Sequence, residues 1–304
     1  MVDADIRVIT GPTAAGKSAI ALDLAERYGA VLISADSRQV YRRFDIGTAK
    51  PTAEERRRVP HVGIDIAEPT ARFSAAAWAA HADAAIDRAR AARREVVVVG
   101  GTGFYLRALF APLFEEPLLD PERRRGLERY LAQLSVAELR RWCIVLDPAR
   151  SHLGRAQLLR TIEVALLTGR PLSALHRSAA RPPRHEARYL VVDPGASLRE
   201  RIETRVDRML AAGWADEVRS LLADVPSEAP AWNAAGYEAL REAVVDRTSL
   251  ERARERIVIE TRQYAKRQRT WMRNQLPRER LTLLDPAAPD AAARADRWWR
   301  GEAA

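Results

Sequence analysis

Cysteine is almost absent from this chain of 304 residues, because Cys143 is the only one. A lone thiol excludes an internal disulfide framework and any zinc site built on a pair of cysteines. The five histidines show no metal-ligand spacing with one another or with this cysteine, and they are His61, His81, His152, His176 and His185. We therefore expect no zinc site.

Long apolar runs are also missing, since none approaches the roughly 18 residues that a membrane span requires. The first residues, Met1 to Asp5, lack the basic start and the apolar region of a secretory signal. We therefore expect a cytoplasmic protein without membrane contacts. The length suggests one large domain or two modest ones, and a monomer is expected.

Lysine is the third rarity, with three lysines against forty-seven arginines. One of the three closes a string that fits G-x-x-x-x-G-K-[ST], in which glycines turn backbone N–H groups toward phosphate oxygens and the ammonium supplies a compact charge. The serine hydroxyl is available to Mg²⁺, and a helix beginning there points its positive end at the phosphates. The string therefore predicts a pyrophosphate or nucleotide site, in which Ser18 is a magnesium ligand. Its residues are Gly11, Pro12, Thr13, Ala14, Ala15, Gly16, Lys17 and Ser18.

Short apolar runs and helical patterns alternate along the first part of the chain. The runs predict strands at residues 6–9, 31–34, 95–99 and 188–192, and the alanine-rich segment 75–93 predicts a helix. This alternation indicates a parallel α/β core over residues 1–114 and 186–304. Between them, residues 115–185 are rich in Arg and Leu and punctuated by proline, which predicts a helical insertion. After residue 192 we expect helices at 198–212, 214–222, 237–245 and 250–274, and a last one after Pro286.

Two polar segments follow the second and third predicted strands. Asp36 comes at the carboxyl end of the second, where α/β proteins place their sites, so it is a candidate magnesium ligand or general base; capping of a following helix is the alternative. The next residues include the second lysine, Lys50, which favours a functional loop. The third strand runs into Gly100-Gly101-Thr102-Gly103 in place of the aspartate that holds Mg²⁺ in ordinary P-loop ATPases. These glycines bring backbone and the Thr102 hydroxyl close to a ligand, or form a tight turn.

A basic surface is expected near the C-terminus. The net charge of +9 and the pI near 10.2 point to a polyanionic partner. On the helix predicted at 250–274, an apolar seam of Leu250, Ile257, Tyr264 and Trp271 recurs every seven residues. On another face lie Arg262, Lys266, Arg269 and Arg273, a cationic stripe that fits phosphates unless it is a solvated surface.

Taken together, five motifs in this order resemble the tRNA dimethylallyltransferase family, also called tRNA isopentenyltransferases: GPTAAGKS, SADSRQVY, DIGTAKP, GGTGFYLRAL and TRQYAKRQRTW. The resemblance covers residues 6 to about 275. It implies transfer of a dimethylallyl group from dimethylallyl pyrophosphate, with Mg²⁺, to the exocyclic amine of the adenosine just 3′ of the anticodon in tRNA. It also implies a P-loop α/β core, similar to nucleotide kinases, with a helical insertion that binds the anticodon stem-loop.

The resemblance assigns roles residue by residue. It implies that Thr13 to Ser18 bind the pyrophosphate, with Lys17 neutralising the leaving group, that Asp36 is the general base and that Thr102 lies near the acceptor nucleotide. Further tRNA contacts are implied for Ser37, Arg38, Gln39, Arg124, Gln157 and Arg160. One departure concerns the family's Asn-Asp-x-Gln-Arg pattern, where this chain has Leu-Gly-Arg-Ala-Gln at 153–157. The tRNA contact there is expected to differ in detail.

Other readings remain open from the residues alone. A P-loop nucleotide or nucleoside kinase shares the phosphate loop but leaves the basic helix and the second glycine turn unexplained. An adenylate isopentenyltransferase acting on free AMP shares the donor site, although the basic insertion argues against it. A P-loop regulator that binds RNA without turnover would leave Asp36 and Thr102 without a role.

Overall fold

The computed structural model describes residues 5–111, 119–178, 184–245 and 247–302. The chain divides into two compact units, one of Met1–Phe110 with Arg184–Ala304 and the other of Ala111–Pro183. The insertion predicted over residues 115–185 overlaps the second unit along most of its length. None of the helices in the described segments combines the length and the apolar character needed to cross a bilayer.

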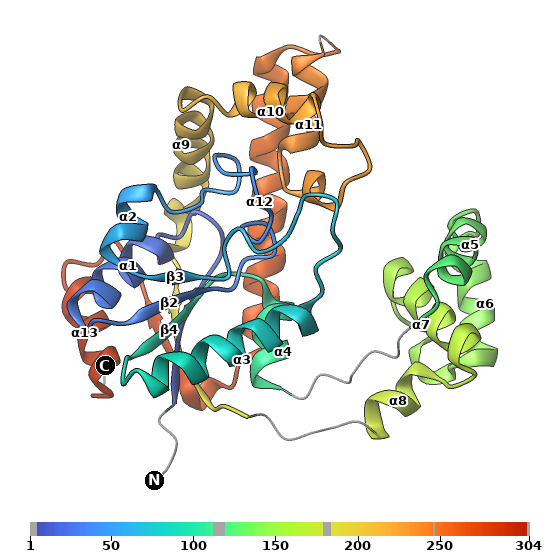
Figure 1. The fold of residues 1–304 in the computed structure, drawn as a ribbon, viewed down its shortest axis with the longest axis horizontal. Coiled ribbons are helices and arrows are strands. Elements are labelled where there is room, and N and C mark those ends of the chain that lie inside the picture. Colours follow the sequence, from blue (N-terminus) through green and yellow to red (C-terminus); the bar gives the residue numbers. More distant parts are fainter. Residues whose placement is uncertain (1–4, 112–118, 179–183, 246, 303–304) are drawn as a thin grey trace. The chain divides into compact units, whose positions relative to one another are not determined.

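The first unit is built on a parallel six-stranded sheet with the order β3-β2-β4-β1-β5-β6 (Figure 1). Its strands are β1 (Ile6–Thr10), β2 (Val31–Ser34), β3 (His61–Val62), β4 (Val96–Val99), β5 (Ala187–Val192) and β6 (Leu281–Leu284). The predicted parallel α/β core is thus confirmed, and all four predicted strands form. Strands β3 and β6 were not predicted, because they are short edge strands in which most side chains are only partly buried or exposed.

Successive side chains of the central strands point to opposite faces of the sheet, so the core has two layers. Val8 and Val98 face one side of the sheet with α3 (Ala75–Ala91) and α4 (Gly103–Phe110). Their neighbours Ile9 and Val97 face the other side, where α1 (Lys17–Arg27) and α13 (Ala291–Arg300) cover them. The sheet is therefore buried on both faces, which explains why its strands are continuous apolar runs.

The remaining helices of this unit extend the first layer away from the sheet (Figure 1). They are α9 (Leu198–Ala211), α10 (Trp214–Leu222), α11 (Tyr237–Val244) and the long α12 (Leu250–Gln275), all close to their predicted bounds. The short α2 (Ala53–Arg58) was not predicted and has no buried residue. Buried aromatic side chains join this part to the loop after β2. Phe44 contacts Trp232 and Tyr237, with ring centroids 5.1 and 4.9 Å apart.

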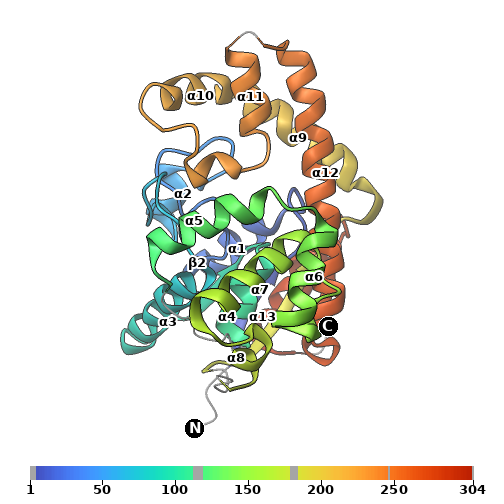
Figure 2. The same cartoon turned by 90° about the vertical axis from the view of Figure 1, so that its right-hand side faces the viewer.

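The second unit is helical, and its elements are α5 (Pro121–Ala132), α6 (Val136–Leu146), α7 (Arg155–Thr168) and α8 (Leu172–Ser178) (Figure 2). Leu131, Leu139 and Ile162 are fully buried in a small core of its own. Buried Asp147 fixes α8, because its carboxylate accepts hydrogen bonds from the Ser173 backbone at 2.8 Å and the Ser173 hydroxyl at 2.6 Å.

Candidate active site

The phosphate-loop string lies between β1 and α1, at the carboxyl edge of the sheet. Gly11 (φ +152°) requires a conformation that favours glycine, and a Cβ there would lie 2.1 Å from the Val192 carbonyl oxygen. Gly16 is left-handed as well and precedes the first residue of α1. The N-terminus of α1, with its unpaired backbone N–H groups, thus lies at this edge of the sheet, as a phosphate site requires.

Lys17 is partly buried in this loop, and its Nζ donates to the Pro12 carbonyl oxygen at 2.7 Å. Burial lowers the pKa of Lys17 to about 7; the Arg205 guanidinium adds to the shift and the Asp36 carboxylate opposes it. An ammonium held near its deprotonation point gains charge when an anion arrives. Lys17 is therefore suited to a ligand that is itself strongly negative.

The second glycine turn is tied to the phosphate loop through one side chain of α12. Buried Gln268 accepts a hydrogen bond from the Thr13 backbone at 2.8 Å and donates to the Gly101 carbonyl at 2.9 Å. A Cβ at Gly101 would lie 2.3 Å from the Gln268 amide nitrogen, so only glycine leaves room for this bridge. The turn after β4 therefore packs closely against α12, and its predicted approach to a ligand stays a prediction.

Asp36 follows β2 and caps the turn after it. One carboxylate oxygen accepts from the backbone N–H groups of Arg38 at 2.8 Å and Gln39 at 3.4 Å. Thr102, from the glycine turn, accepts from the Ser37 backbone at 3.0 Å and so fixes the same segment from the other side. Asp36 therefore caps a turn, and not the helix that the alternative prediction expected, and it also lines both pockets described below.

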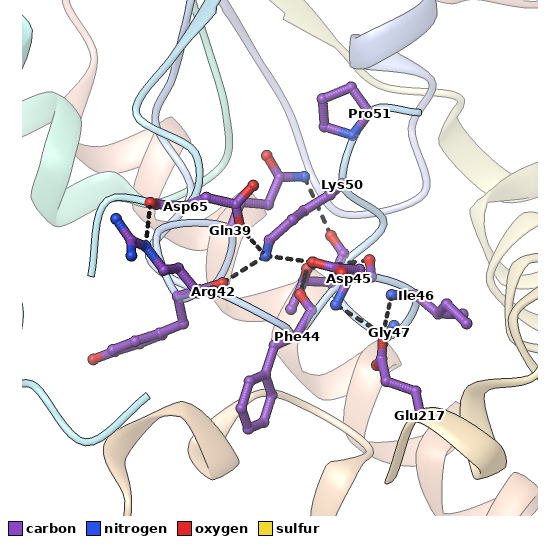
Figure 3. A network of polar contacts seen from close by, with 12 residues as sticks. Gln39, Arg42, Phe44, Asp45, Ile46, Gly47, Lys50, Pro51, Asp65 and Glu217 are labelled. Carbon is purple, nitrogen blue, oxygen red and sulfur yellow. Dashed lines mark hydrogen bonds and ion pairs between the residues drawn. The ribbon is translucent and has the colours of Figure 1, made fainter. Parts of the chain in front are cut away.

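The loop after Asp36 is held by Lys50, which lies at the centre of Figure 3. Its Nζ donates to the Tyr41 carbonyl at 2.5 Å and to the carboxylates of Asp45 and Asp65, both at 2.6 Å. These contacts use all three ammonium protons, and the side chain is 2% exposed. Lys50 consequently shapes the loop and is not available to a ligand.

Two further side chains complete this scaffold (Figure 3). Gln39 accepts from the Ser34 hydroxyl at 2.8 Å and donates to the Ala49 carbonyl at 2.9 Å, so its amide is occupied inside the protein. Glu217 of α10 accepts from the backbone N–H groups of Asp45 at 2.8 Å and Ile46 at 2.7 Å. The loop is thus fixed against both the sheet and the helical layer.

Two pockets meet at this loop. One, of about 340 Å³, contains Lys17 and Ser18, and the other, of about 610 Å³, contains Arg38 and polar side chains of α12. Five residues line both: Thr13, Asp36, Thr48, Arg205 and Tyr264. A phosphate-binding pocket is therefore continuous with a larger one, and Asp36 lies at their junction.

Sequence reasoning gave Arg205 and Tyr264 no role in the site. Burial lowers the pKa of Arg205, while the nearby Asp36 carboxylate opposes that shift. Burial, and then the charge of Asp36, raise the pKa of Tyr264 to about 12, so its hydroxyl keeps its proton. The two residues are far apart in sequence, and the available signals were the arginine-rich character of both helices and the presence of Tyr264 in the motif TRQYAKRQRTW.

The cationic stripe predicted on α12 is only partly correct. Arg269 is not free, because its guanidinium pairs with Asp193 and donates from Nε at 2.9 Å. Arg262, Lys266 and Arg273 are exposed and have no ion-pair partner in the part of the chain that the structure describes. The apolar seam also starts later than predicted, since Leu250 is 50% exposed whereas Ile257 is buried.

The residues assigned to tRNA in the insertion lie in the second unit. Arg124 and Arg160 both pair with Glu163, with N–O distances of 3.3 and 2.7 Å, and Glu163 is buried. Arg124 therefore joins α5 to α7, whereas Arg160 pairs with Glu163 within α7. Gln157 is exposed, and its amide oxygen accepts from the Gly154 backbone at 3.2 Å at the start of α7.

Comparison with known proteins adds a family to this geometry. The family model described as IPP transferase matches residues 39–275. The chain is 45% identical over 274 residues to a tRNA dimethylallyltransferase from Geobacter metallireducens, covering 88% of each protein. It is 43% identical over 275 residues to one from Gloeobacter violaceus, covering 88% of this chain and 89% of that protein.

Solved structures agree with these relatives. The full-length tRNA isopentenylpyrophosphate transferase from Bacillus halodurans matches with a TM-score of 0.70 and 30% identity, over 98% of this chain and 96% of that one. A eukaryotic dimethylallyltransferase acting on tRNA has the same fold, with a TM-score of 0.79 at 23% identity, over 99% of this chain and 81% of that one.

Proposed function

The chain belongs to the IPP transferase family, and we propose that it transfers a dimethylallyl group from dimethylallyl pyrophosphate to the exocyclic amine of the adenosine just 3′ of the anticodon in tRNA. The observation that supports this most directly is the junction of two pockets at Asp36. A two-substrate transfer needs a donor site and an acceptor site that meet at the reacting atoms, and a hydrolase needs only the first.

The smaller pocket suits the donor. Pyrophosphate oxygens would lie against the backbone N–H groups at the start of α1, with Lys17 and Arg205 supplying positive charge. Because an allylic pyrophosphate ionises once its departing charge is neutralised, these groups supply most of the catalysis. The larger pocket then receives the adenosine, which must leave the stacked anticodon loop to reach the donor.

Asp36 acts on the acceptor. A neutral aromatic amine is a poor nucleophile, so the carboxylate needs only to orient the amine and take its proton as the new carbon–nitrogen bond forms. The hydrogen bonds from the Arg38 and Gln39 backbone hold one carboxylate oxygen in place for this task. Thr102, bonded to the Ser37 backbone, keeps the segment at a fixed distance from the glycine turn.

A magnesium ion fits this site if the phosphates of the donor supply some of its ligands. No group of three or more His, Cys, Asp or Glu among the described residues could hold a metal ion by itself. Ser18 and Asp36 nevertheless line the same pocket, and Mg²⁺ is commonly held by one or two protein oxygens together with substrate phosphates. When bound there, the ion supplies positive charge to the departing pyrophosphate. We further propose a cytoplasmic monomer.

Incubation with dimethylallyl pyrophosphate labelled in the prenyl group, and with either unmodified tRNA or AMP, tests the proposal. We expect label in tRNA and none in AMP. Label in AMP alone would favour an adenylate isopentenyltransferase, and phosphate transfer from ATP to a small acceptor would favour a kinase.

A further inference from the structure

Two aromatic side chains of the second unit are exposed side by side. Tyr130, near the end of α5, is 52% exposed, and Trp142 of α6 is 36% exposed. Their ring centroids are 6.3 Å apart, with an angle of 58° between the planes. The residue after each ring, Leu131 and Cys143, is fully buried, so the helices turn these rings outward while their apolar neighbours form the core.

The surface around the rings is positively charged. Helices α5 and α6 together contain six arginines and three glutamates. Arg129 precedes Tyr130 in the chain and Arg141 precedes Trp142, and both are exposed without an ion-pair partner in the described segments. Exposed rings on helices with an excess of positive charge indicate a partner that is both anionic and aromatic.

We propose that Tyr130 and Trp142 form a stacking platform for an unpaired base of RNA, with Arg129 and Arg141 contacting the adjoining phosphates. Proteins recognise unpaired RNA segments by stacking bases on aromatic side chains and guanidinium planes. The proposal rests on the proposed function, because the RNA it expects is the tRNA substrate. It adds a contact that depends on the base and not only on charge.

Other exposed apolar side chains on the same helix provide the control. Val145 is 81% exposed and lies one turn beyond Trp142 on α6, but it has no ring to stack. A protein partner would use Val145 together with the rings, since burial of any apolar surface favours association. A stacked base would depend on the rings alone.

The test is binding of unmodified tRNA to full-length variants, measured at several salt concentrations. We expect Trp142→Ala to weaken binding about tenfold, because stacking of one base contributes roughly 1–3 kcal/mol. Its log–log salt slope should equal that of the wild type, whereas Arg141→Ala should flatten the slope by about one. Trp142→Phe should restore most of the affinity, and Val145→Ala should leave it unchanged.

Two outcomes would overturn the platform. One is an affinity of Trp142→Ala within twofold of the wild type, with a thermal melt that shows an intact fold. The other is an equal loss in Val145→Ala, which would indicate a general apolar contact. Prenyl transfer by the wild type is measured in parallel, so that a wild type that binds tRNA through Trp142 but transfers nothing would refute the proposed function and leave the platform standing.

Discussion

At the scale of single residues, the site depends on how one carboxylate is held. Asp36 has one oxygen fixed by two backbone N–H groups and lies where the two pockets meet. An asparagine there can keep the same hydrogen bonds through its amide oxygen, but it cannot accept a proton. The substitution therefore separates the structural role of this residue from its chemical one.

We expect Asp36→Asn to keep tRNA affinity near normal while lowering turnover by about 10² to 10⁴, the range of a lost general base. Asp23→Asn is the control, because Asp23 is an exposed carboxylate of α1 outside both pockets. The measurement is turnover at saturating substrates. Wild-type turnover in the Asp36 variant would remove this residue from the mechanism.

Lys17 predicts a pH dependence of donor binding. In the protein without donor, Lys17 has a pKa of about 7, so it loses its charge as the pH rises above that value. A bound pyrophosphate favours the ammonium, and binding then takes up a proton, so affinity should fall between pH 7 and 9 by at most about tenfold per pH unit. Calorimetric titration with inorganic pyrophosphate measures both the affinity and the number of protons taken up.

Substitution of the same lysine gives the control. Lys17→Arg should bind pyrophosphate weakly at every pH, because a planar guanidinium does not replace a point charge in this loop, and its affinity should vary less between pH 7 and 9. Constant affinity of the wild type across this range would contradict a titrating Lys17, and full activity of the arginine variant would contradict the need for a point charge.

At the scale of elements, the sequence predicts those helices and strands whose bounds are determined by the local residue pattern. Most elements of the first unit lie within a few residues of their predicted bounds. They include the strands β1, β2, β4 and β5 and the helical segments. What local pattern cannot give is pairing between distant segments. Lys50 with Asp65, and Arg269 with Asp193, form ion pairs that only the folded chain brings together.

The bridge from α12 to the two glycine turns predicts a coupled loss. Gln268→Ala leaves the partly buried Thr13 N–H and Gly101 carbonyl without their partner, so we expect a loss of about 1 kcal/mol of unfolding free energy. Donor affinity should fall as well, because the phosphate loop loses its support. Denaturant unfolding and pyrophosphate binding are the measurements, with the exposed Gln275→Ala as control. A stability equal to that of the control would refute the bridge.

Arg124 separates a structural role from an RNA contact. Arg124→Ala removes one of two guanidinium groups from buried Glu163, so we expect a loss of about 1–2 kcal/mol and a lower melting temperature. The exposed neighbour Arg123 has no ion pair among the described residues, and Arg123→Ala should leave the melting temperature unchanged. An unchanged melt in Arg124→Ala, together with a flatter salt slope of tRNA binding, would assign Arg124 to tRNA alone.

At the scale of the whole molecule, the architecture explains why distant motifs act together. Strands β2, β4, β1 and β5 are neighbours in a parallel sheet, so the segments after them all emerge at one edge. The order of motifs along the sequence therefore predicted a shared site. It could not predict that Arg205 and Tyr264 complete that site, because no local pattern reports which helix faces the sheet edge.

The position of the transferred group on tRNA decides whether this protein has the proposed activity. Unmodified tRNA is incubated with the protein and labelled dimethylallyl pyrophosphate and then digested to nucleosides, which are identified by mass and by their place in the sequence. We expect one prenylated adenosine, substituted on its exocyclic amine and located just 3′ of the anticodon, and almost none with Asp36→Asn. Label on another nucleoside, or equal labelling by the Asp36 variant, would contradict it.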